Sequence, residues 1–103
     1  MKKIFLFLCG VALASPAFSG ANWIGGNIID ITSATQGLMV RIDAGVPDNC
    51  AGTFFGWMLI PDSARTMVAV TLIARLQNTP VAIYTSGLDA SGQCIVVQVD
   101  PNG

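Results

Sequence analysis

The chain has 103 residues, a hydrophobic share of 52%, 11 glycines, three cysteines, no histidine and a formal net charge of −1. This length suits one small domain. Apart from Lys2 and Lys3, three arginines face six aspartates and no glutamate, which leaves the bulk of the chain at −3. This composition excludes a basic nucleic-acid binder, most metal enzymes and histidine-based acyl transfer, because the residues that these functions require are missing.

The N-terminus has the pattern of an export signal. Two lysines precede an apolar run from Ile4 to Ala14, and small residues follow it. Cleavage after Ser19 and cleavage after Ala21 both place small residues at the −3 and −1 positions. The alternative is a membrane anchor, but this run is too short to cross about 30 Å of hydrocarbon. We expect a signal peptide over 1–19, a single mature domain over 20–103 without a membrane span, and a periplasmic or secreted location.

The mature chain keeps two cysteines, Cys50 and Cys94, because Cys9 lies within the expected signal. An even pair in a small exported domain indicates a disulfide. The closed loop of about 45 residues corresponds to about 4 kcal/mol in the chain-entropy model. A redox or metal role is the alternative, but the spacing is not Cys-x-x-Cys and no histidine is available as a further ligand.

The first half of the mature chain is expected to be extended. Residues 23–34 are rich in isoleucine and predict a strand, in which Gly25 and Gly26 indicate a bulge or a bend. Residues 35–37 suit a hairpin turn, and residues 38–44 alternate between apolar and polar as a second strand does. A loop over 45–52 follows, and the aromatic segment 53–60 predicts a third strand.

The second half contains the expected helix, over residues 64–77. Asp62 or Ser63 can cap its first amides, and Asn78-Thr79-Pro80 ends it. Five β-branched residues lower its helix propensity and leave a strand as the alternative, but the run is long for a strand and rich in Ala, Leu and Met. Residues 80–85 and 93–99 predict two further strands, joined by a Gly-, Ser- and Asp-rich loop over 86–92.

The expected order is therefore β-β-β-α-β-β, in an α+β fold that is mostly β. Five strands with one helix between strands 3 and 4 is the order of an OB-type barrel. One helix cannot cover both faces of an open sheet, so closure into a barrel would bury these strands. The alternative is an open α+β sheet with the helix on one face. We expect a five-stranded OB-like barrel over 20–103.

No group of residues indicates catalysis. Asp48, Asp62 and Asp100 neighbour Pro, Asn or Ser, and Asp89 lies two residues from a glycine and a serine. Asp usually stabilises turns and caps in such places, and no motif pairs any two of the six aspartates. The serines have neither a histidine nor, in the mature chain, a lysine as a base. The sequence thus predicts a protein that is not an enzyme and has no cofactor and no metal site.

Aromatic residues are the candidates for ligand binding. Phe54, Phe55 and Trp57 lie close to glycines, and aromatic rings so placed on a small barrel can stack on sugar rings. The alternative is that they belong to the core. With Tyr84, the only tyrosine, Phe54 and Trp57 form the candidate ligand-binding set.

The expected helix indicates self-association. Its sequence ARTMVAVTLIARLQ is apolar nearly all round, and such a helix is buried on more than one side. A domain this small has no second layer to cover it, so we expect a homo-oligomer. The alternative is that small Ala and Thr residues merely make one side less polar. The expected interface residues are Met67, Val68, Thr71, Leu72 and Arg75.

The segment from Val46 to Val99 resembles the binding subunits of bacterial pentameric toxins, particularly the subtilase cytotoxin B subunit and its small relatives. The matching features are a cysteine ahead of a Trp-containing segment, a Ser-initiated helix, the stretch Thr79-Pro80-Val81-Ala82-Ile83-Tyr84 and a second cysteine in the closing strand. The resemblance implies an OB barrel, assembly into a ring with central helices, and glycan recognition on the barrel. This chain is shorter than the toxin subunit, and no glycan-contact residue is transferred from it.

Two functions remain open from the sequence. The first is a non-catalytic exported binding domain that recognises a glycan, similar to a toxin B subunit. The alternative is a structural or protein-interaction domain of the bacterial envelope without a small-molecule ligand. Neither function involves nucleic acid.

Overall fold

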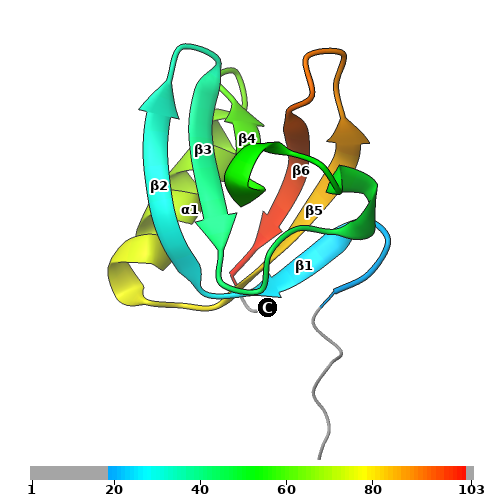
Figure 1. Ribbon diagram of the computed structural model, residues 1–103. Coiled ribbons are helices and arrows are strands. Elements are labelled where there is room, and N and C mark those ends of the chain that lie inside the picture. Colours follow the sequence, from blue (N-terminus) through cyan, green and yellow to red (C-terminus); the bar gives the residue numbers. More distant parts are fainter. Residues whose placement is uncertain (1–18, 102–103) are drawn as a thin grey trace, which may run out of the picture.

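The computed structural model describes residues 19–101, which form one curved six-stranded sheet and one α-helix (Figure 1). The strand order is β1-β5-β6-β4-β3-β2, and the described pairs are antiparallel except for β4 with β6. The mostly β class is therefore confirmed. In chain order, the elements are β1 (Trp23–Gly26), β2 (Ile28–Ala34), β3 (Gly37–Ile42), the 3-10 turns η2 (Asp48–Cys50) and η3 (Phe54–Gly56), β4 (Met58–Pro61), α1 (Arg65–Gln77), β5 (Val81–Leu88) and β6 (Cys94–Asp100).

The predicted first strand is divided into β1 and β2 at Asn27. β1 pairs with β5 and β2 pairs with β3, so two consecutive strands occupy the two ends of the strand order. The Asn27 backbone N–H donates to the Asp43 carboxylate at 3.0 Å, and the Asp43 N–H donates back to the Asn27 carbonyl at 3.0 Å. At Gly26, a Cβ would lie 2.9 Å from the Ile42 side chain, so this close approach requires glycine.

The expectation of a closed five-stranded barrel is wrong. The sheet is open and has six strands, and the order along the chain is β-β-β-β-α-β-β. The bend or bulge expected at Gly25 and Gly26 corresponds to a break one residue later: at Asn27 the chain leaves β5 and takes β3 as its partner. Gly26, next to the break, permits this change of direction because it has no Cβ to meet the Ile42 side chain.

Two other predicted boundaries differ from the structure by three residues or more. The third strand begins at Met58 and not at Thr53, because Phe55 and Gly56 have φ angles of 54° and 78° that no strand accommodates. Strand β5 continues to Leu88, beyond its predicted end at Thr85. Two register shifts interrupt its pairing with β6, and Gly87, which lies in the second shift, adopts a φ of 103°.

The helix is confirmed at α1 despite its β-branched residues. Thr71 and Ala74 are buried against the sheet, so tertiary packing outweighs the propensity penalty. The Thr71 hydroxyl donates to the Met67 carbonyl one turn earlier, which satisfies this buried polar group inside the helix. Asn78 ends the helix in the left-handed conformation, with its N–H bonded to the Arg75 carbonyl.

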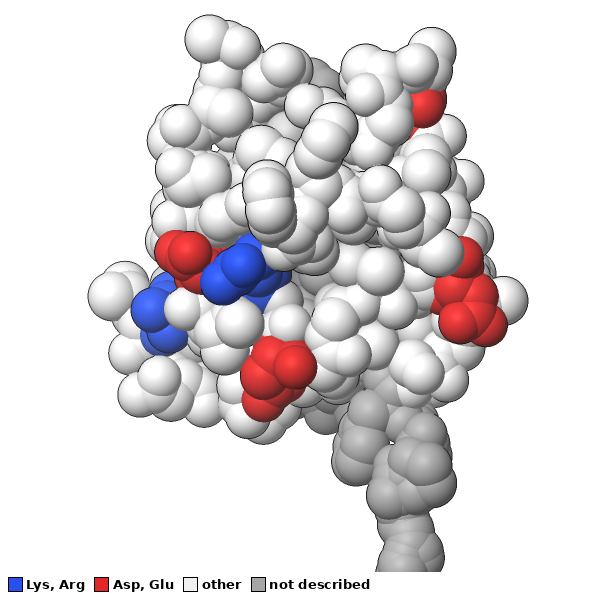
Figure 2. All heavy atoms as spheres, in the orientation of Figure 1, with Lys and Arg blue, Asp and Glu red and all other residues white. Residues whose placement is uncertain are grey.

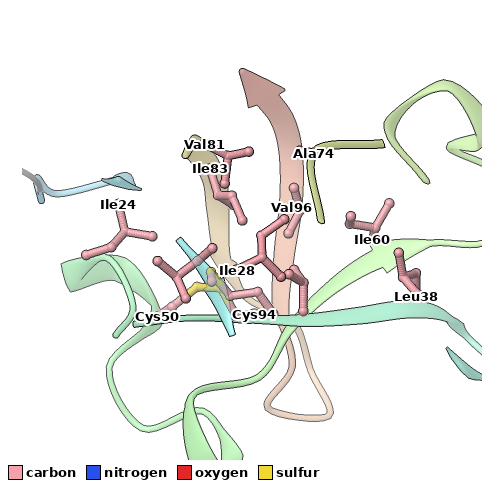
Figure 3. Close-up of a cluster of buried hydrophobic side chains, with 13 residues drawn as sticks. Ile24, Ile28, Leu38, Cys50, Ile60, Ala74, Val81, Ile83, Cys94 and Val96 are labelled. Carbon is pink, nitrogen blue, oxygen red and sulfur yellow. A yellow bond between two sulfur atoms is a disulfide. The ribbon is translucent and has the colours of Figure 1, made fainter. Parts of the chain in front are cut away.

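A single apolar core lies between the inner faces of the strands and α1 (Figure 3). The predicted disulfide is confirmed: Cys50 and Cys94 are both fully buried, with an S–S distance of 2.06 Å, and they join η2 to the start of β6. The other buried members are Ile24, Ile28, Leu38, Val40, Ile42, Met58, Ile60, Ala74, Val81, Ile83 and Val96.

Candidate functional site

Residues 53–57, which include η3, form an exposed segment that we call the aromatic loop. The side chains of Phe54 and Phe55 are 70% and 81% exposed, which is unusual for large apolar residues. Phe55 has φ 54° and ψ 23°, the left-handed region, which costs a bulky L-residue about 1–2 kcal/mol. The loop is closed by the Thr53 hydroxyl, which donates to the Trp57 carbonyl at 2.9 Å, and by the Trp57 N–H, which donates to the Phe54 carbonyl at 3.0 Å. These bonds hold both phenyl rings in solvent.

Arg41 of β3 contacts the aromatic loop. Its guanidinium carbon lies 5.1 Å from the centroid of the Trp57 ring, within the range of a cation–π contact, and its Nη1 donates to the Phe55 carbonyl at 3.3 Å. Its Nη2 lies 4.0 Å from the Asp30 carboxylate on β2, an ion pair that contributes little because both groups are partly exposed. Within residues 19–101, the buried Arg41 Nε has no hydrogen-bond partner. Arg41 thus connects the loop to the sheet.

Tyr84 lies in a different place from the other two predicted ligand residues. It is paired across strands with Trp23, with ring centroids 6.4 Å apart and planes inclined by 31°. Both rings are half-buried. The structure therefore groups Phe54 with Trp57 in the aromatic loop and places Tyr84 beside Trp23.

The predicted ligand-binding set lacked Arg41 and Trp23, and it also lacked Phe55, although the sequence placed this residue in one aromatic group with Phe54 and Trp57. Phe55 could have been chosen with Phe54, since it stands between that residue and a glycine. Arg41 had a weaker signal: it is one of three arginines outside the expected export signal and lies on the polar side of an alternating strand. Trp23 had none, because the cross-strand register that brings it to Tyr84 is a property of the folded sheet.

The five expected interface residues lie on different sides of α1. Thr71 is fully buried within its own chain, and the half-buried Met67 and Val68 pack against the core. Arg75 is exposed, and its Nη1 donates to the Ile28 carbonyl at 3.0 Å. Leu72 is 38% exposed. Of the expected set, Leu72 and Arg75 are therefore the residues that solvent reaches most readily.

The outer side of α1 carries an apolar strip that we call the α1 stripe. Ile73 and Leu76 are 54% and 83% exposed, and they line up with Leu72 and Ala69 at the three- and four-residue spacing of one helix face. A groove runs along each flank of the stripe. One is lined by residues that include Ile31 of β2 and Leu72, and the other by residues that include Ile73 and Pro101.

Charged side chains are sparse and scattered on the face drawn in Figure 2, where most of the surface is uncharged. Asp89, in the loop between β5 and β6, accepts hydrogen bonds from the Gln93 N–H at 3.0 Å and from the Ser91 hydroxyl at 2.7 Å. These bonds, with the Gln93 backbone the largest cause, lower the pKa of the Asp89 carboxyl below its ordinary value of 3.8. Asp89 therefore stabilises a turn, as the sequence indicates for an aspartate two residues from a glycine and a serine.

Comparisons of the chain with protein-family models, with curated protein sequences and with solved structures gave no match. In the part of the chain that the structure describes, no three His, Cys, Asp or Glu residues gather closely enough to hold a metal ion. None of the helical segments between residues 19 and 101 has both the length and the hydropathy to cross a bilayer. The aromatic loop and the α1 stripe remain as the two surfaces whose composition points to a binding function.

Proposed function

We propose that this chain is a non-catalytic exported binding domain that recognises a glycan through the aromatic loop. The observation that carries the proposal is the exposure of two adjacent phenyl rings, Phe54 and Phe55, at 70% and 81%. A sugar ring has one or two faces made of C–H groups, whose slight positive charge suits the negative face of an aromatic ring. Exposed apolar groups with polar neighbours are typical of ligand sites.

The arrangement of the loop before any ligand binds supports this proposal. Phe55 is held in a left-handed conformation by bonds on both sides of it, from Thr53 and from Arg41. Strained residues of this kind concentrate at functional sites. A loop that is already ordered loses little conformational freedom on binding, which favours affinity. The Arg41 guanidinium, partly exposed beside Trp57, can also donate hydrogen bonds to sugar hydroxyls.

The fold and the disulfide are compatible with export and with an OB-like relationship. If β1 and β2 count as the two halves of one strand interrupted at Asn27, five strands remain, with the helix between the third and the fourth. OB folds are partly open barrels that bind oligosaccharides with a sheet face and loops. A buried disulfide is typical of exported proteins. The resemblance to toxin-binding subunits leads to the same proposal.

A glycan array on the exported, disulfide-bonded protein tests the proposal. Phe54→Ala and Phe55→Ala are expected to weaken binding about tenfold or more each, which corresponds to about 1.4 kcal/mol. Phe54→Leu is the matched variant: it keeps an apolar side chain but removes the ring, and it should also weaken binding if stacking is the cause. Val97→Ala, at an exposed apolar position on β6, should leave binding unchanged. A wild-type protein that binds no glycan, or binding that survives both alanine variants, contradicts the proposal.

A second candidate function, protein interaction in the envelope, is favoured by the α1 stripe. Leu76 and Ile73 are exposed at 83% and 54% on one helix face, and contiguous exposed apolar residues can mark a protein-interaction site. We propose that the partner is another copy of this chain, and the toxin resemblance implies a ring. In sedimentation velocity, the wild type should run as an oligomer and Leu76→Asp as a monomer. Ala90→Asp, an equal change of charge at an exposed position of the β5–β6 loop, should remain oligomeric. A monomeric wild type contradicts this candidate.

A further inference from the structure

The first described residues are fastened to the fold through their backbone carbonyls. The Gly20 carbonyl accepts the Asp48 N–H at 3.2 Å, and the Ala21 carbonyl accepts the Asn49 N–H at 2.8 Å. In Figure 1, this blue segment lies beside the green connection that contains η2. Since Cys50 follows directly in η2, both bonds stabilise the backbone that carries one end of the disulfide.

Two further contacts integrate the same segment. The Asn22 carbonyl accepts the Thr85 N–H of β5 at 2.9 Å, and the Gly20 nitrogen donates to the Trp23 carbonyl at 2.8 Å. Gly20 lies so close to the Trp23 indole that a Cβ there would stand 2.8 Å from the ring carbon Cδ1. A side chain at this position would have to displace the indole, so Gly20 packs as a residue of the folded domain.

This arrangement discriminates between the two cleavage positions that the sequence allows. Cleavage after Ala21 removes both carbonyls that accept the Asp48 and Asn49 N–H groups. Cleavage after Ser19 gives up the isolated β-bridge between Ser19 and Ile24 but keeps both of these carbonyls. A signal peptide is dispensable to the mature fold, so the cut is expected outside the residues that the fold uses.

We propose that the export signal is cut between Ser19 and Gly20, and that Gly20 is the N-terminal residue of the mature domain. A signal endopeptidase would hydrolyse this bond. The oxygen of water joins the Ser19 carbonyl carbon as its bond to the Gly20 nitrogen breaks. Ser19 leaves as a carboxylate on the released peptide, and the Gly20 nitrogen takes up both protons of that water and becomes an ammonium group. That ammonium can keep the bond to the Trp23 carbonyl, now with the added strength of a charged donor. The proposal is independent of the proposed ligand.

The test uses the full chain expressed in a bacterial host, with the exported protein isolated under non-reducing conditions. Intact mass and N-terminal sequencing should show a single species that begins at Gly20. A start at Asn22 or at any other residue, or an exported protein that retains the signal, overturns the proposal. Neither reading depends on whether a variant folds.

Two matched variants distinguish cleavage after Ser19 from cleavage after Ala21. Signal cleavage needs small residues at −3 and −1. Ala17→Phe alters the −3 position of the proposed cut alone and should abolish processing. Ala21→Phe alters the −1 position of the other cut, lies at an exposed position of the folded chain, and should be processed at Gly20 as the wild type is. The reverse pattern overturns the proposal, and so does processing of both variants at Asn22.

A structural measurement completes the test. In the purified wild type, the backbone amides of Asp48 and Asn49 should exchange with deuterium at least tenfold more slowly than that of Ala90, in the exposed β5–β6 loop. Equal exchange rates at the three amides would show that the Gly20 and Ala21 carbonyls do not hold η2, and would remove the structural reason for a cut after Ser19.

Discussion

The two single-turn helices between β3 and β4 have the same size and opposite surroundings. In η2, Cys50 is fully buried and cross-linked to Cys94, and the side chain of Asn49 makes two hydrogen bonds with Thr85. In η3, no residue is buried, and Phe54 and Phe55 stand in solvent. One connection thus contains a turn that is cross-linked to β6 and a turn whose two phenyl rings are exposed.

The comparison shows that two neighbouring turns have separate roles: η2 attaches the connection to the fold, and η3 exposes the aromatic rings. The Thr53 N–H donates to the Cys50 carbonyl at 3.2 Å, so the first residue of the aromatic loop is bonded directly to the cross-linked turn. η2 fixes where the loop begins, and Arg41 fixes where its other end lies. We therefore expect changes in η2 to act mainly on stability and changes in η3 to act mainly on binding.

The largest effect is expected from removing the disulfide. The double variant Cys50→Ala, Cys94→Ala should lower the free energy of unfolding by about 2–5 kcal/mol, because the unfolded chain regains the freedom of the closed loop. Urea unfolding under non-reducing conditions measures this loss. Reductant added to the wild type is the control and should shift the midpoint in the same direction. Unfolding midpoints that do not differ would show that η2 is held by other contacts.

A smaller effect is expected at Asn49. Its Nδ2 donates to the Thr85 carbonyl at 3.0 Å, and its Oδ1 accepts the Thr85 hydroxyl at 2.6 Å. Because Thr85 is buried, Asn49→Ala leaves its polar groups without these partners, at a cost of about 1–3 kcal/mol. Thr85→Val completes a double-mutant cycle in the same urea assay, and the two losses should be clearly less than additive. Fully additive losses would contradict a direct coupling between η2 and β5.

How much of the molecule the sequence predicts depends on whether a feature arises from neighbouring residues or from residues far apart in the chain. The helix, the disulfide and most strands follow from local patterns, since the stop at Asn78, the alternation and the cysteine number lie in neighbouring residues. The expected cap at Asp62 or Ser63 is wrong, because Ala64 is the N-cap residue and makes no side-chain bond to the first amides. The break at Asn27 depends on Asp43, sixteen residues away, and the turn at Phe55 depends on Arg41. Such long-range contacts leave no periodic signal. Phe54 was a candidate from the sequence, whereas its exposure is a result of the fold.

A still smaller effect is expected from relieving the strain in η3. Phe55→Gly removes the penalty of the left-handed conformation, so it should be about 1 kcal/mol more stable to urea than Phe55→Ala, which keeps the penalty. Both variants should lose glycan binding, because both lack the ring. This result would show that Phe55 lowers the stability of the fold while its ring contributes to glycan binding. A Phe55→Gly protein no more stable than Phe55→Ala would show that the conformation of Phe55 stores no strain.

The smallest effect is expected in the β5–β6 loop, which lies next to Cys94 and is held by polar contacts. The Gln93 N–H and the Ser91 hydroxyl bind the ionised Asp89 carboxylate and lower its pKa below 3.8. A group whose pKa is lower in the folded state stabilises it above the unfolded pKa, and this contribution disappears as the pH falls through the folded value. An NMR titration should place the Asp89 pKa below 3.8, and Ser91→Ala should raise it. Titration at or above the ordinary value would mean that this loop, unlike η2, has no fixed structure beside the disulfide.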